Sequence, residues 1–507
     1  ITTATDAYNI AIGSSAGASI TTGLYNTLVG GLAGDALTDA DFNVAIGVVA
    51  LSTDTLGSKS IAIGHNTLNS QNFTTATDTH NIAIGFQAGT GITTGVQNTL
   101  IGSLAGDAIT DADFNVAIGI NALTTDTLGG KSVAVGHSAL ANQNFTTATD
   151  SYNTAVGDVA GTAITTGTQN TIVGGLAADA LTIGFQNVAI GVDALSNDRA
   201  GNKSVAIGRS ALSSQNFSSD TDGLNTAVGY FAGVGITTGK RNAFYGAEAG
   251  ADNTTGESNT YIGRQAGTLM TTGSNNTIIG RYNGNQGGLD IRTASNNIVL
   301  SDGDGNPRGV FNSSGQFMVG GTSNANAGML EVSQVTTGRV TLALRNTSAA
   351  PYGQLNYFTG AAPNNTINYF YYGTDNSAVR VIIYSNGNLQ NANNSYGAIS
   401  DVKLKENIVD SGSQWDDIKA LRVRKYSLKE QNASEPTQIG VIAQEVEAAG
   451  MGGLVYESPD RDAENNDIGT VTKAVQYSVI YMKAIKALQE AMDRIESLEA
   501  RITTLEG

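Results

Sequence analysis

The chain of 507 residues contains no cysteine, only five prolines and few charged side chains. Each of these low counts excludes certain kinds of site or structure. Without cysteine, the protein can form no disulfide, thiol nucleophile or zinc–thiolate site. Charged residues make up 14% of the chain, against roughly 25% in an ordinary globular domain. No apolar run is long enough for a transmembrane helix, so we expect no membrane insertion.

The charge balance and the start of the chain bear on possible partners. The chain carries 44 acidic and 27 basic residues, a net charge of -17. Because nucleic-acid binding needs a basic surface, we expect no nucleic acid as a partner. The sequence begins Ile1-Thr2-Thr3 without an initiator methionine, and we expect that an N-terminal part has been trimmed.

A five-residue block recurs from position 9 to position 301. It reads NIAIG at 9–13, NTLVG at 26–30 and NVAIG at 43–47. The glycines that close the blocks follow three equal steps and one longer step, and the pattern then restarts, so that one super-repeat runs from Gly13 to Gly85 and the next from Gly85 to Gly157. A degenerate block, NIVLS at 297–301, lies one further long step along the chain. Such short-period self-similarity is the signature of a solenoid.

Each block predicts a short β-strand followed by a turn. The block-closing glycine permits positive φ or a close backbone approach. The asparagine at the block start suits a turn, where it can bond nearby backbone or stack in a ladder with its copies. All prolines lie at or after Pro307, which fits strands that donate ladder hydrogen bonds on both sides. The sequence therefore predicts a mainly β protein with a parallel β-roll or solenoid over residues 1–301.

The block pattern resembles the head repeats of trimeric autotransporter adhesins of the YadA type, and the resemblance covers residues 9 to about 301. In that family three chains each form a parallel β-roll and pack side by side. The resemblance therefore implies a homotrimer. A single repeat cannot bury its apolar face alone, so we expect stacking and trimerisation to complete the core.

Three aromatic side chains on the array are candidate receptor contacts. Phe73, Phe145 and Phe217 occur once in each super-repeat, each after a Gln-Asn pair. Aromatic rings flanked by amides could stack on the sugars of a receptor. The alternative, which we favour, is that the rings fill the roll or a subunit interface.

Acidic turns and histidines are the other polar features of the array. The segments 35–41 and 107–113 could gather oxygens for Ca²⁺. The third copy, 179–184, loses two carboxylates, so we favour solvated turns. The only histidines are His65, His80 and His137, and the first and last follow equivalent glycines at a surface ladder position. The sequence supports no metal site and no cofactor.

The composition changes from about residue 302, and we expect a β-rich distal domain over 302–399. Alternating segments at 339–344, 354–358 and 379–384 predict strands, with turns at 386–388 and 393–397. Aromatic residues gather nearby, and they offer a carbohydrate-binding face or, as we favour, a β-sandwich core or trimer seam. They include Tyr369, Tyr371 and Tyr372.

The last hundred residues resemble the C-terminal intramolecular chaperone domain of phage endosialidases, tail spikes and tail fibres. The resemblance lies in 400–408 (SDVKLKENI), in 438–447 (QIGVIAQEVE) and in the closing run 474–505. That family's domain drives trimer assembly and then cuts itself off. The resemblance implies that residues 400–507 form this domain, with Ser400 as nucleophile, Lys405 as base and the cut between Ile399 and Ser400.

The chemistry of this pair is reasonable from the residues alone. A serine hydroxyl needs a base to attack a peptide carbonyl, and no histidine lies beyond His137. A lysine can be that base if burial lowers its pKa. The alternative is that Lys405 is a surface residue in a basic run with Lys403.

The closing helix carries a heptad pattern of apolar residues. Ion-pair partners such as Arg494 and Glu499 flank it. Isoleucine at a with leucine at d favours a dimer, whereas both resembled families are trimeric, and we expect a trimer. The alternative is a single amphipathic helix docked on its own domain. The seam consists of Tyr477, Tyr481, Ala484, Leu488, Ala491, Ile495, Leu498, Ile502 and Leu505.

These features together favour a homotrimeric phage tail fibre that binds a host-surface glycan or protein receptor. We expect it in the virion tail, assembled in the host cytoplasm and joined to other tail proteins through a missing N-terminal part. Self-cleavage is the only enzymatic activity expected. A bacterial trimeric surface adhesin is one alternative, disfavoured because those adhesins end in a membrane-anchoring β-barrel. A glycan-cleaving tail spike is another, and it would need paired carboxylates in a groove.

Overall fold

The structure is a computed structural model. It divides into two compact units, Ile1–Ala343 and Leu344–Gly507, and each is described by itself. The residues that it describes are 6–319, 330–332, 369–374, 378–385, 389–392, 400–429, 437–461 and 467–507.

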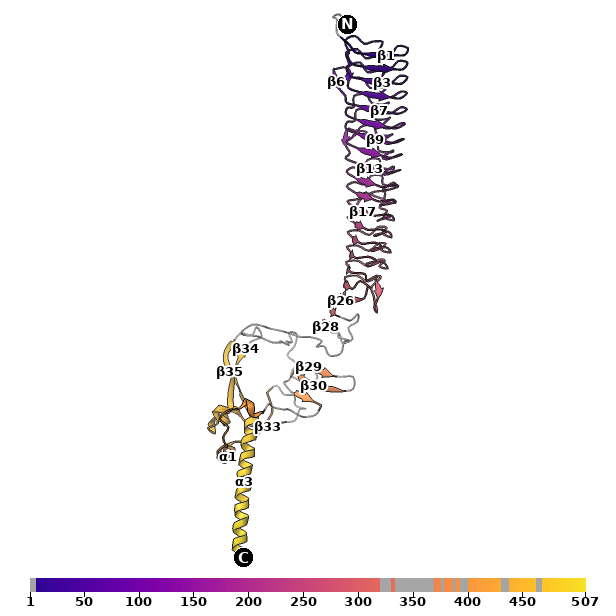
Figure 1. Cartoon of the computed structure of the whole chain (residues 1–507). Helices are drawn as coiled ribbons and strands as arrows, with labels where there is room; N and C mark the ends of the chain where they lie inside the picture. The colour runs from indigo at the N-terminus through magenta and orange to yellow at the C-terminus, as the bar shows by residue number, and fades with distance from the viewer. Residues whose placement is uncertain are drawn as a thin grey trace. The chain divides into compact units, whose positions relative to one another are not determined.

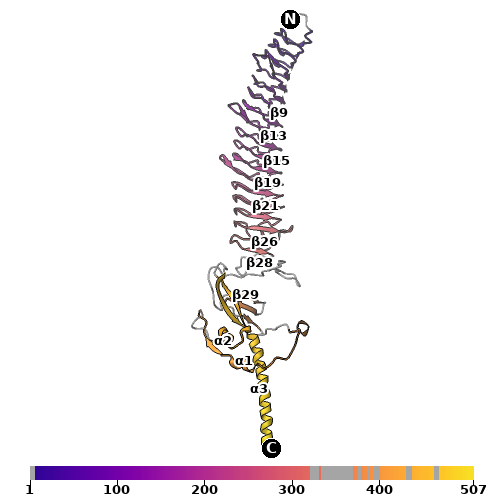
Figure 2. The same ribbon diagram turned by 90° about the vertical axis from the view of Figure 1, so that its left-hand side faces the viewer.

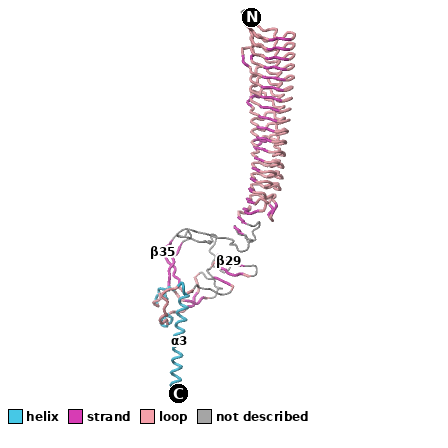
Figure 3. The backbone as a smooth tube through the Cα atoms, in the orientation of Figure 1, coloured by secondary structure: helices cyan, strands magenta, loops and turns pink. Residues whose placement is uncertain are grey.

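The first unit is a parallel β-solenoid of about 17 turns, as the repeats predict. Every predicted block forms a short strand, and each strand pairs in parallel with the equivalent strand of the next coil (Figures 1 and 2). Most of each coil consists of turns and loops rather than strand (Figure 3). The strands are β1 (Ile10–Ile12), β2 (Thr27–Val29), β3 (Val44–Ile46), β5 (Ile61–Ile63), β7 (Ile82–Ile84), β8 (Thr99–Ile101), β9 (Val116–Ile118), β11 (Val133–Val135), β13 (Thr154–Val156), β14 (Thr171–Val173), β15 (Val188–Ile190), β17 (Val205–Ile207), β19 (Thr226–Val228), β20 (Ala243–Tyr245), β21 (Thr260–Ile262), β22 (Thr277–Ile279) and β25 (Ile298–Ser301).

The glycine that closes each block is required by the stacking of the coils. Gly47 has a φ of +142°, which L residues rarely adopt. A Cβ at this position would lie 2.2 Å from the carbonyl oxygen of Gly64 in the next coil. The column of glycines therefore lets successive backbones approach within hydrogen-bonding distance.

The asparagine that opens each block connects neighbouring coils from inside the roll. The side-chain oxygen of Asn26 accepts a hydrogen bond from the backbone N–H of Asn43, at 2.9 Å. Its amide nitrogen donates to the carbonyl of Ala40, at 2.8 Å. Asn26 and Asn43 are fully buried. Because the bonds repeat along the column, each buried amide stabilises two coils at once.

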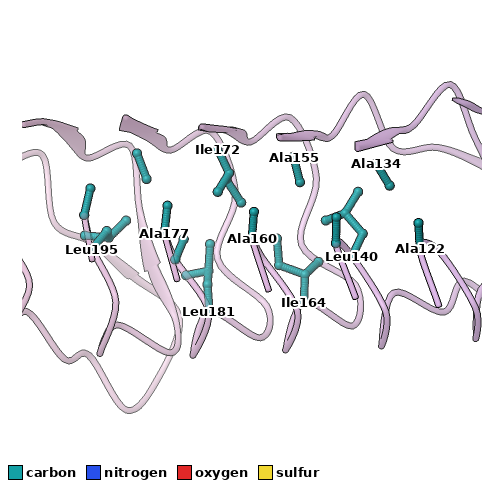
Figure 4. Packing of buried hydrophobic residues seen from close by; sticks show 14 of the residues in the cluster. Ala122, Ala134, Leu140, Ala155, Ala160, Ile164, Ile172, Ala177, Leu181 and Leu195 are labelled. Atoms are coloured by element: carbon teal, nitrogen blue, oxygen red, sulfur yellow. The ribbon is translucent and has the colours of Figure 1, made fainter. Parts of the chain in front are cut away.

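The core of the solenoid is a row of small and branched side chains (Figure 4). The middle residue of each strand points inward, as Ala155 and Ile172 do, and both are fully buried. Small residues stand beside large ones in this core, so that the side chains fit together. A Cβ at Gly34 would lie 2.8 Å from the side chains of both Leu28 and Leu37, so this glycine makes room for the leucines.

The longest coil of each super-repeat adds a second ladder that the block pattern does not predict. A two-residue strand of this coil pairs in parallel with a two-residue strand of the preceding coil, and such a pair recurs once in each of the three super-repeats. The pairs are β4 (Gly57–Ser58) with β6 (Thr77–Asp78), β10 (Gly129–Gly130) with β12 (Thr149–Asp150), and β16 (Gly201–Asn202) with β18 (Thr221–Asp222).

The solenoid sheet continues beyond residue 301 with a change of strand direction. Strand β26 (Pro307–Phe311) pairs antiparallel with β25, and β27 (Phe317–Val319) pairs antiparallel with β26. Strand β28 (Leu330–Val332) follows in parallel. A small hairpin of β23 (Asn285–Gln286) and β24 (Leu289–Asp290) precedes this end. The antiparallel strands cover the open edge of the last coil, which would otherwise present unpaired backbone groups.

The second unit contains a three-stranded antiparallel sheet, formed by β29 (Tyr369–Thr374), β30 (Val379–Tyr384) and β31 (Leu389–Asn391). The strand predicted at 379–384 is confirmed. The strands predicted at 339–344 and 354–358 and the turns at 386–388 and 393–397 lie outside the described residues.

The remainder of the second unit mixes short strands and helices and ends in a long helix, as predicted. No described helix is long and apolar enough to cross a membrane. The elements are η1 (Val402–Leu404), α1 (Trp415–Ala420), β32 (Arg424–Tyr426), β33 (Gln438–Gly440), α2 (Ala443–Ala448), η2 (Gly452–Leu454), β34 (Val455–Arg461), β35 (Asp467–Val475) and α3 (Tyr477–Glu506).

Candidate functional site

Ser400 and Lys405 lie within hydrogen-bonding distance of each other. The Lys405 ammonium donates to the Ser400 hydroxyl oxygen, with 2.7 Å between Nζ and Oγ. The short helix η1 makes this contact possible, because its turn folds the chain back between the two residues. Asp401 caps that turn by accepting a hydrogen bond from the backbone N–H of Lys403, at 3.0 Å. Ile399, on the other side of the expected cleavage bond, lies outside the described residues.

The pair is exposed to solvent in the single chain. A lysine acts as a base only where its surroundings disfavour the charged form, and desolvation is the usual cause. The geometry of a serine–lysine dyad is therefore present, whereas the burial that would activate it is not supplied by this chain alone. The catalytic roles remain predictions.

Apolar side chains surround the pair and are also exposed. Val402 is 69% exposed, Leu404 65%, Ile408 64% and Val409 84%. Four apolar side chains this accessible in one short segment are unusual on the surface of a monomer and mark an interaction surface.

The segment that follows the pair is attached to helix α3. Glu490 of α3 accepts hydrogen bonds from the Ser413 hydroxyl, at 2.7 Å, and from the backbone N–H of Gln414, at 2.9 Å. These donors hold the pKa of Glu490 below its usual value. The guanidinium of Arg494 lies 4.3 Å from the ring centroid of Trp415 in α1. Helix α3 thus fixes the region just after the candidate dyad.

The second sequence motif, 438–447, packs where β32, β33, α2 and α3 meet. A Cβ at Gly440 would lie 2.4 Å from the Tyr477 hydroxyl oxygen, so a side chain there would have to displace this hydroxyl. That hydroxyl accepts a hydrogen bond from the Val441 N–H, at 3.0 Å. Arg424 forms a bidentate pair with Glu445, and this pair lowers the pKa of the Glu445 carboxyl. The motif residues are therefore structural.

Helix α3 presents most of its predicted heptad seam to solvent. Tyr481 is 60% exposed, Leu488 62%, Ile495 53%, Leu498 53% and Ile502 52%. Docking on its own domain involves a different face of the helix, where Ile480 and Ala487 are buried and Glu490 and Arg494 make their contacts. A row of exposed apolar residues at heptad spacing is typical of a helix that lacks its partners.

The two sets of predicted receptor contacts differ in their exposure to solvent. Phe73 and Phe145 are each 6% exposed and Phe217 is 4% exposed, so their rings fill space within the roll and leave no face for a sugar. The backbone N–H of Phe145 donates to the buried carboxylate of Asp126, at 3.1 Å, which fixes the ring inside. This burial corresponds to the alternative that we favoured.

The tyrosines of the second set lie on strand β29 and remain accessible. Tyr369 is 48% exposed, Tyr371 52% and Tyr372 43%. The rings of Tyr369 and Tyr372 lie 4.8 Å apart. They remain candidate receptor contacts.

The acidic turns of the solenoid serve as backbone caps. Asp41 accepts a hydrogen bond from the Leu24 N–H and Asp113 from the Val96 N–H, each at 2.7 Å. Among the described residues, no group of three acidic or histidine side chains is placed to hold a metal ion. His65 stacks on Phe86 of the next coil, and His137 contacts Asp158, so both occupy the predicted ladder position.

Sequence reasoning missed a buried polar cluster in each super-repeat. Asp126 is fully buried and accepts hydrogen bonds from the backbone N–H groups of Gly129 and Phe145 and from the side chain of Gln143. Gln143 in turn accepts from Asn153. The same cluster is built on Asp54 and on Asp198. The signal was available, because in every super-repeat an aspartate follows the third block-closing glycine and a glutamine stands at the equivalent position of the next coil.

Comparison with known proteins identifies one part of the chain. The model of the family described as chaperone of endosialidase matches residues 400–456. The match begins at Ser400 and includes the first two motifs. No curated protein and no solved structure matches the chain. A chaperone-of-endosialidase domain, whose family is associated with trimer assembly, therefore stands at the C-terminal end of a β-solenoid, an arrangement that fits fibre and spike proteins.

Proposed function

We propose that this protein is a homotrimeric fibre of the phage-tail type, which binds a receptor on the host surface. Residues 400–507 drive its assembly and then release themselves by cutting before Ser400. The observation that carries the proposal is the family match at 400–456, directly after the expected cleavage bond, on a chain whose first unit is a β-solenoid.

Two exposed apolar surfaces support self-association. One is the seam of α3. The other follows the solenoid strands, whose outer residues face away from the core: Ile46 is 37% exposed, Ile262 42% and Ile279 44%. These residues recur at each ladder step, so they form a continuous apolar strip. An exposed apolar strip of this kind is typical of an interaction surface.

Assembly would also complete the chemistry of the dyad. A second copy packed on Val402, Leu404 and Ile408 would remove water from Lys405 and favour its neutral form. The neutral amine takes the hydroxyl proton of Ser400 as its oxygen bonds to the Ile399 carbonyl carbon. The bond between that carbon and the Ser400 nitrogen then breaks, and the nitrogen receives the proton. Water hydrolyses the resulting ester, which leaves a carboxylate on Ile399 and the free amine and hydroxyl of Ser400.

The receptor-binding part of the proposal has its own support. A fibre that presents accessible aromatic residues can stack them against a receptor. The exposed tyrosines Tyr369, Tyr371 and Tyr372 meet this requirement.

The test is the mass and oligomeric state of the freshly expressed protein. We expect a trimer by light scattering and, under denaturing conditions, a fragment that begins Ser400-Asp401. Ser400→Ala and Lys405→Ala should leave full-length chains that still form trimers. Lys403→Ala is the matched control, because Lys403 is also exposed but contacts Asp401 rather than Ser400, and it should be cut normally.

Two outcomes would contradict parts of the proposal. If the wild type is cut and both dyad variants are cut equally well, the dyad is wrong. If the wild type forms trimers and stays whole, the domain acts only as a retained trimerisation module.

A further inference from the structure

A column of side chains lies along one flank of the solenoid, at the residue that immediately precedes each block. We call it the flank column. Every member has a positive φ, between 50° and 63°, so the backbone turns at the same point in each coil. The members are Tyr8, Tyr25, Phe42, Lys59, His80, Gln97, Phe114, Lys131, Tyr152, Gln169, Gln186, Lys203, Leu224, Arg241, Ser258, Asn275 and Asn296.

The identities of these residues are not explained by the turn. A left-handed conformation costs an L residue about 1–2 kcal/mol, and asparagine tolerates it best. The chain uses asparagine at the last two positions, Asn275 and Asn296, but aromatic residues at Tyr25, Phe42 and Phe114. The rings of Tyr25 and Phe42 stack on each other, with 4.9 Å between their centroids, but the rings remain accessible, because Phe42 is 52% exposed and Phe114 50%. Strained residues that add little to the core are typical of binding sites.

Phe114 stands at the edge of a cleft with a volume of about 430 Å³, which lies within the usual range for small-molecule sites. Asp111, Asp113 and Asp150 contribute carboxylates to the lining, and Lys131 contributes an ammonium group. The Lys131 Nζ lies 2.6 Å from the Asp150 carboxylate.

A second ring extends this arrangement toward the next coil. Tyr152 is 52% exposed, and the Lys131 ammonium lies 5.2 Å from the centroid of its ring. The cleft therefore contains one accessible ring with adjacent positive and negative hydrogen-bonding groups, and a second accessible ring lies beside its lysine.

The lysine–aspartate pair and one nearby ring recur along the solenoid, whereas His80 and Leu224 stand where Tyr152 stands. The pairs Lys59–Asp78 and Lys203–Asp222 occupy the positions equivalent to Lys131–Asp150 in the super-repeats before and after it. Phe42 stands in the first copy where Phe114 stands in the second, and in the third copy the Phe185 ring lies 5.8 Å from the Lys203 ammonium. Four coils separate successive copies, a distance of roughly 19 Å at the spacing of β-strands.

We infer that the aromatic and lysine members of the flank column bind an uncharged saccharide chain, with the aromatic rings stacked on sugar rings and the lysine–aspartate pairs bound to sugar hydroxyls. A hydroxyl both accepts and donates a hydrogen bond, so it can accept from Lys131 and donate to Asp150. Three carboxylates against one ammonium in the cleft disfavour phosphate, sulfate and acidic sugars. Copies at a regular spacing suit a polymer. The inference deepens the proposed receptor binding and rests on it.

The experiment compares saccharide binding by the full-length protein and two matched variants. The probes are hexasaccharides of glucose, mannose, galactose and N-acetylglucosamine, with hexagalacturonate as the acidic control, measured by saturation-transfer NMR and calorimetry. Phe42→Asn/Phe114→Asn replaces two rings by asparagine, which the column itself carries at Asn275 and Asn296. Gln97→Asn/Gln169→Asn places asparagine at two column positions that carry neither a ring nor a lysine and lie outside the cleft lining, and it is the control.

We expect the wild-type trimer to bind at least one neutral hexasaccharide and not hexagalacturonate. The phenylalanine variant should bind it about tenfold more weakly, and the glutamine variant as the wild type does. Lys131→Met should also weaken binding, because the methionine side chain has no donor for the sugar hydroxyl.

Four results would overturn the inference. They are a wild-type trimer that binds none of the neutral hexasaccharides, a preference for hexagalacturonate, equal binding by the two variants, and dissociation of the phenylalanine variant into monomers. The last result would place the column in a subunit contact. Light scattering distinguishes failure of this inference from failure of the proposed assembly. A monomeric wild type that binds saccharide would refute the trimer but would still support saccharide binding at the cleft.

Discussion

The solenoid and the C-terminal region differ in how far a single chain buries its own apolar side chains. In the solenoid, one chain encloses its own core: the inward residue of nearly every strand is fully buried, and the asparagine column pairs its polar atoms with neighbouring coils. In residues 400–507, the described part buries only a few apolar side chains, among them Val446 and Ile480, and exposes most of the α3 seam.

This contrast shows where each region must obtain its stability. A coil of the solenoid is completed by the next coil of the same chain, so its stability is a sum of nearest-neighbour interfaces. The described part of residues 400–507 buries few apolar side chains, so we expect that other copies complete the core of this region. The region that is weakest alone is therefore the one suited to bring chains together before the solenoids align.

The largest expected effect comes from removing the chaperone region before folding. Deleting residues 400–507 from the gene should abolish nearly all soluble trimer, because non-local parallel pairing is slow and leaves edges exposed to aggregation. The measurement is light scattering of the soluble fraction. In the control, a protease site placed before residue 400 in the Ser400→Ala chain removes the region after folding, and the shaft should remain trimeric. Soluble trimers from the shortened gene would contradict the chaperone role.

The sequence predicts the solenoid well because its rules are local and repeated. The spacing of the block glycines places every strand of the ladder, since a parallel register needs only equivalent residues in equivalent coils. The position of the Ser400–Lys405 pair also follows from a motif. What the sequence does not show is burial. Asp126 reads as one more polar turn residue, and only the closed coil reveals that it is inside.

The C-terminal region is less predictable for a different reason. Its seam on α3 can be read from heptad spacing, but whether that seam faces its own domain or another chain depends on contacts distant in sequence. The structure shows Leu488 and Ile495 uncovered by their own chain. Which surface covers them is a property of the assembly, and a single sequence carries no direct record of it.

A smaller effect should follow from breaking one buried polar cluster. Gln143→Leu removes the side-chain donor to the buried Asp126 carboxylate and should destabilise the local coils by about 2–3 kcal/mol, the cost of losing a hydrogen bond to a buried charged group. Hydrogen exchange of the surrounding coils measures it, because a solenoid opens locally. Gln97→Leu, at an exposed turn where the equivalent Leu224 occurs naturally, is the control. Equal exchange in the two variants would show that the cluster is not a stabilising feature.

The smallest expected effect is a dependence on pH at the third copy of this cluster. Burial raises the pKa of the Asp198 carboxyl, and its donors are all uncharged: the Gln215 amide and the backbone N–H groups of Gly201 and Phe217. The folded state therefore holds this proton more tightly than the unfolded chain does. The contribution of Asp198 to stability should be greatest below the ordinary aspartate pKa of about 4 and should fall as the pH rises through the higher folded value.

The difference between the wild type and Asp198→Asn isolates this carboxyl from the many others. The measurement is hydrogen-exchange protection of the coils around Gln215, corrected for the pH dependence of intrinsic exchange. The protection of the wild type should exceed that of the variant most at acidic pH, and the difference should shrink as the pH rises. Asn cannot reproduce the site fully, because its amide would face the Gln215 amide, whose oxygen is already committed to Asn225. The variant should therefore be less stable than the wild type where Asp198 is protonated. A difference that is constant across the acidic range, or that grows with pH, would show that the buried carboxyl is not the group that titrates.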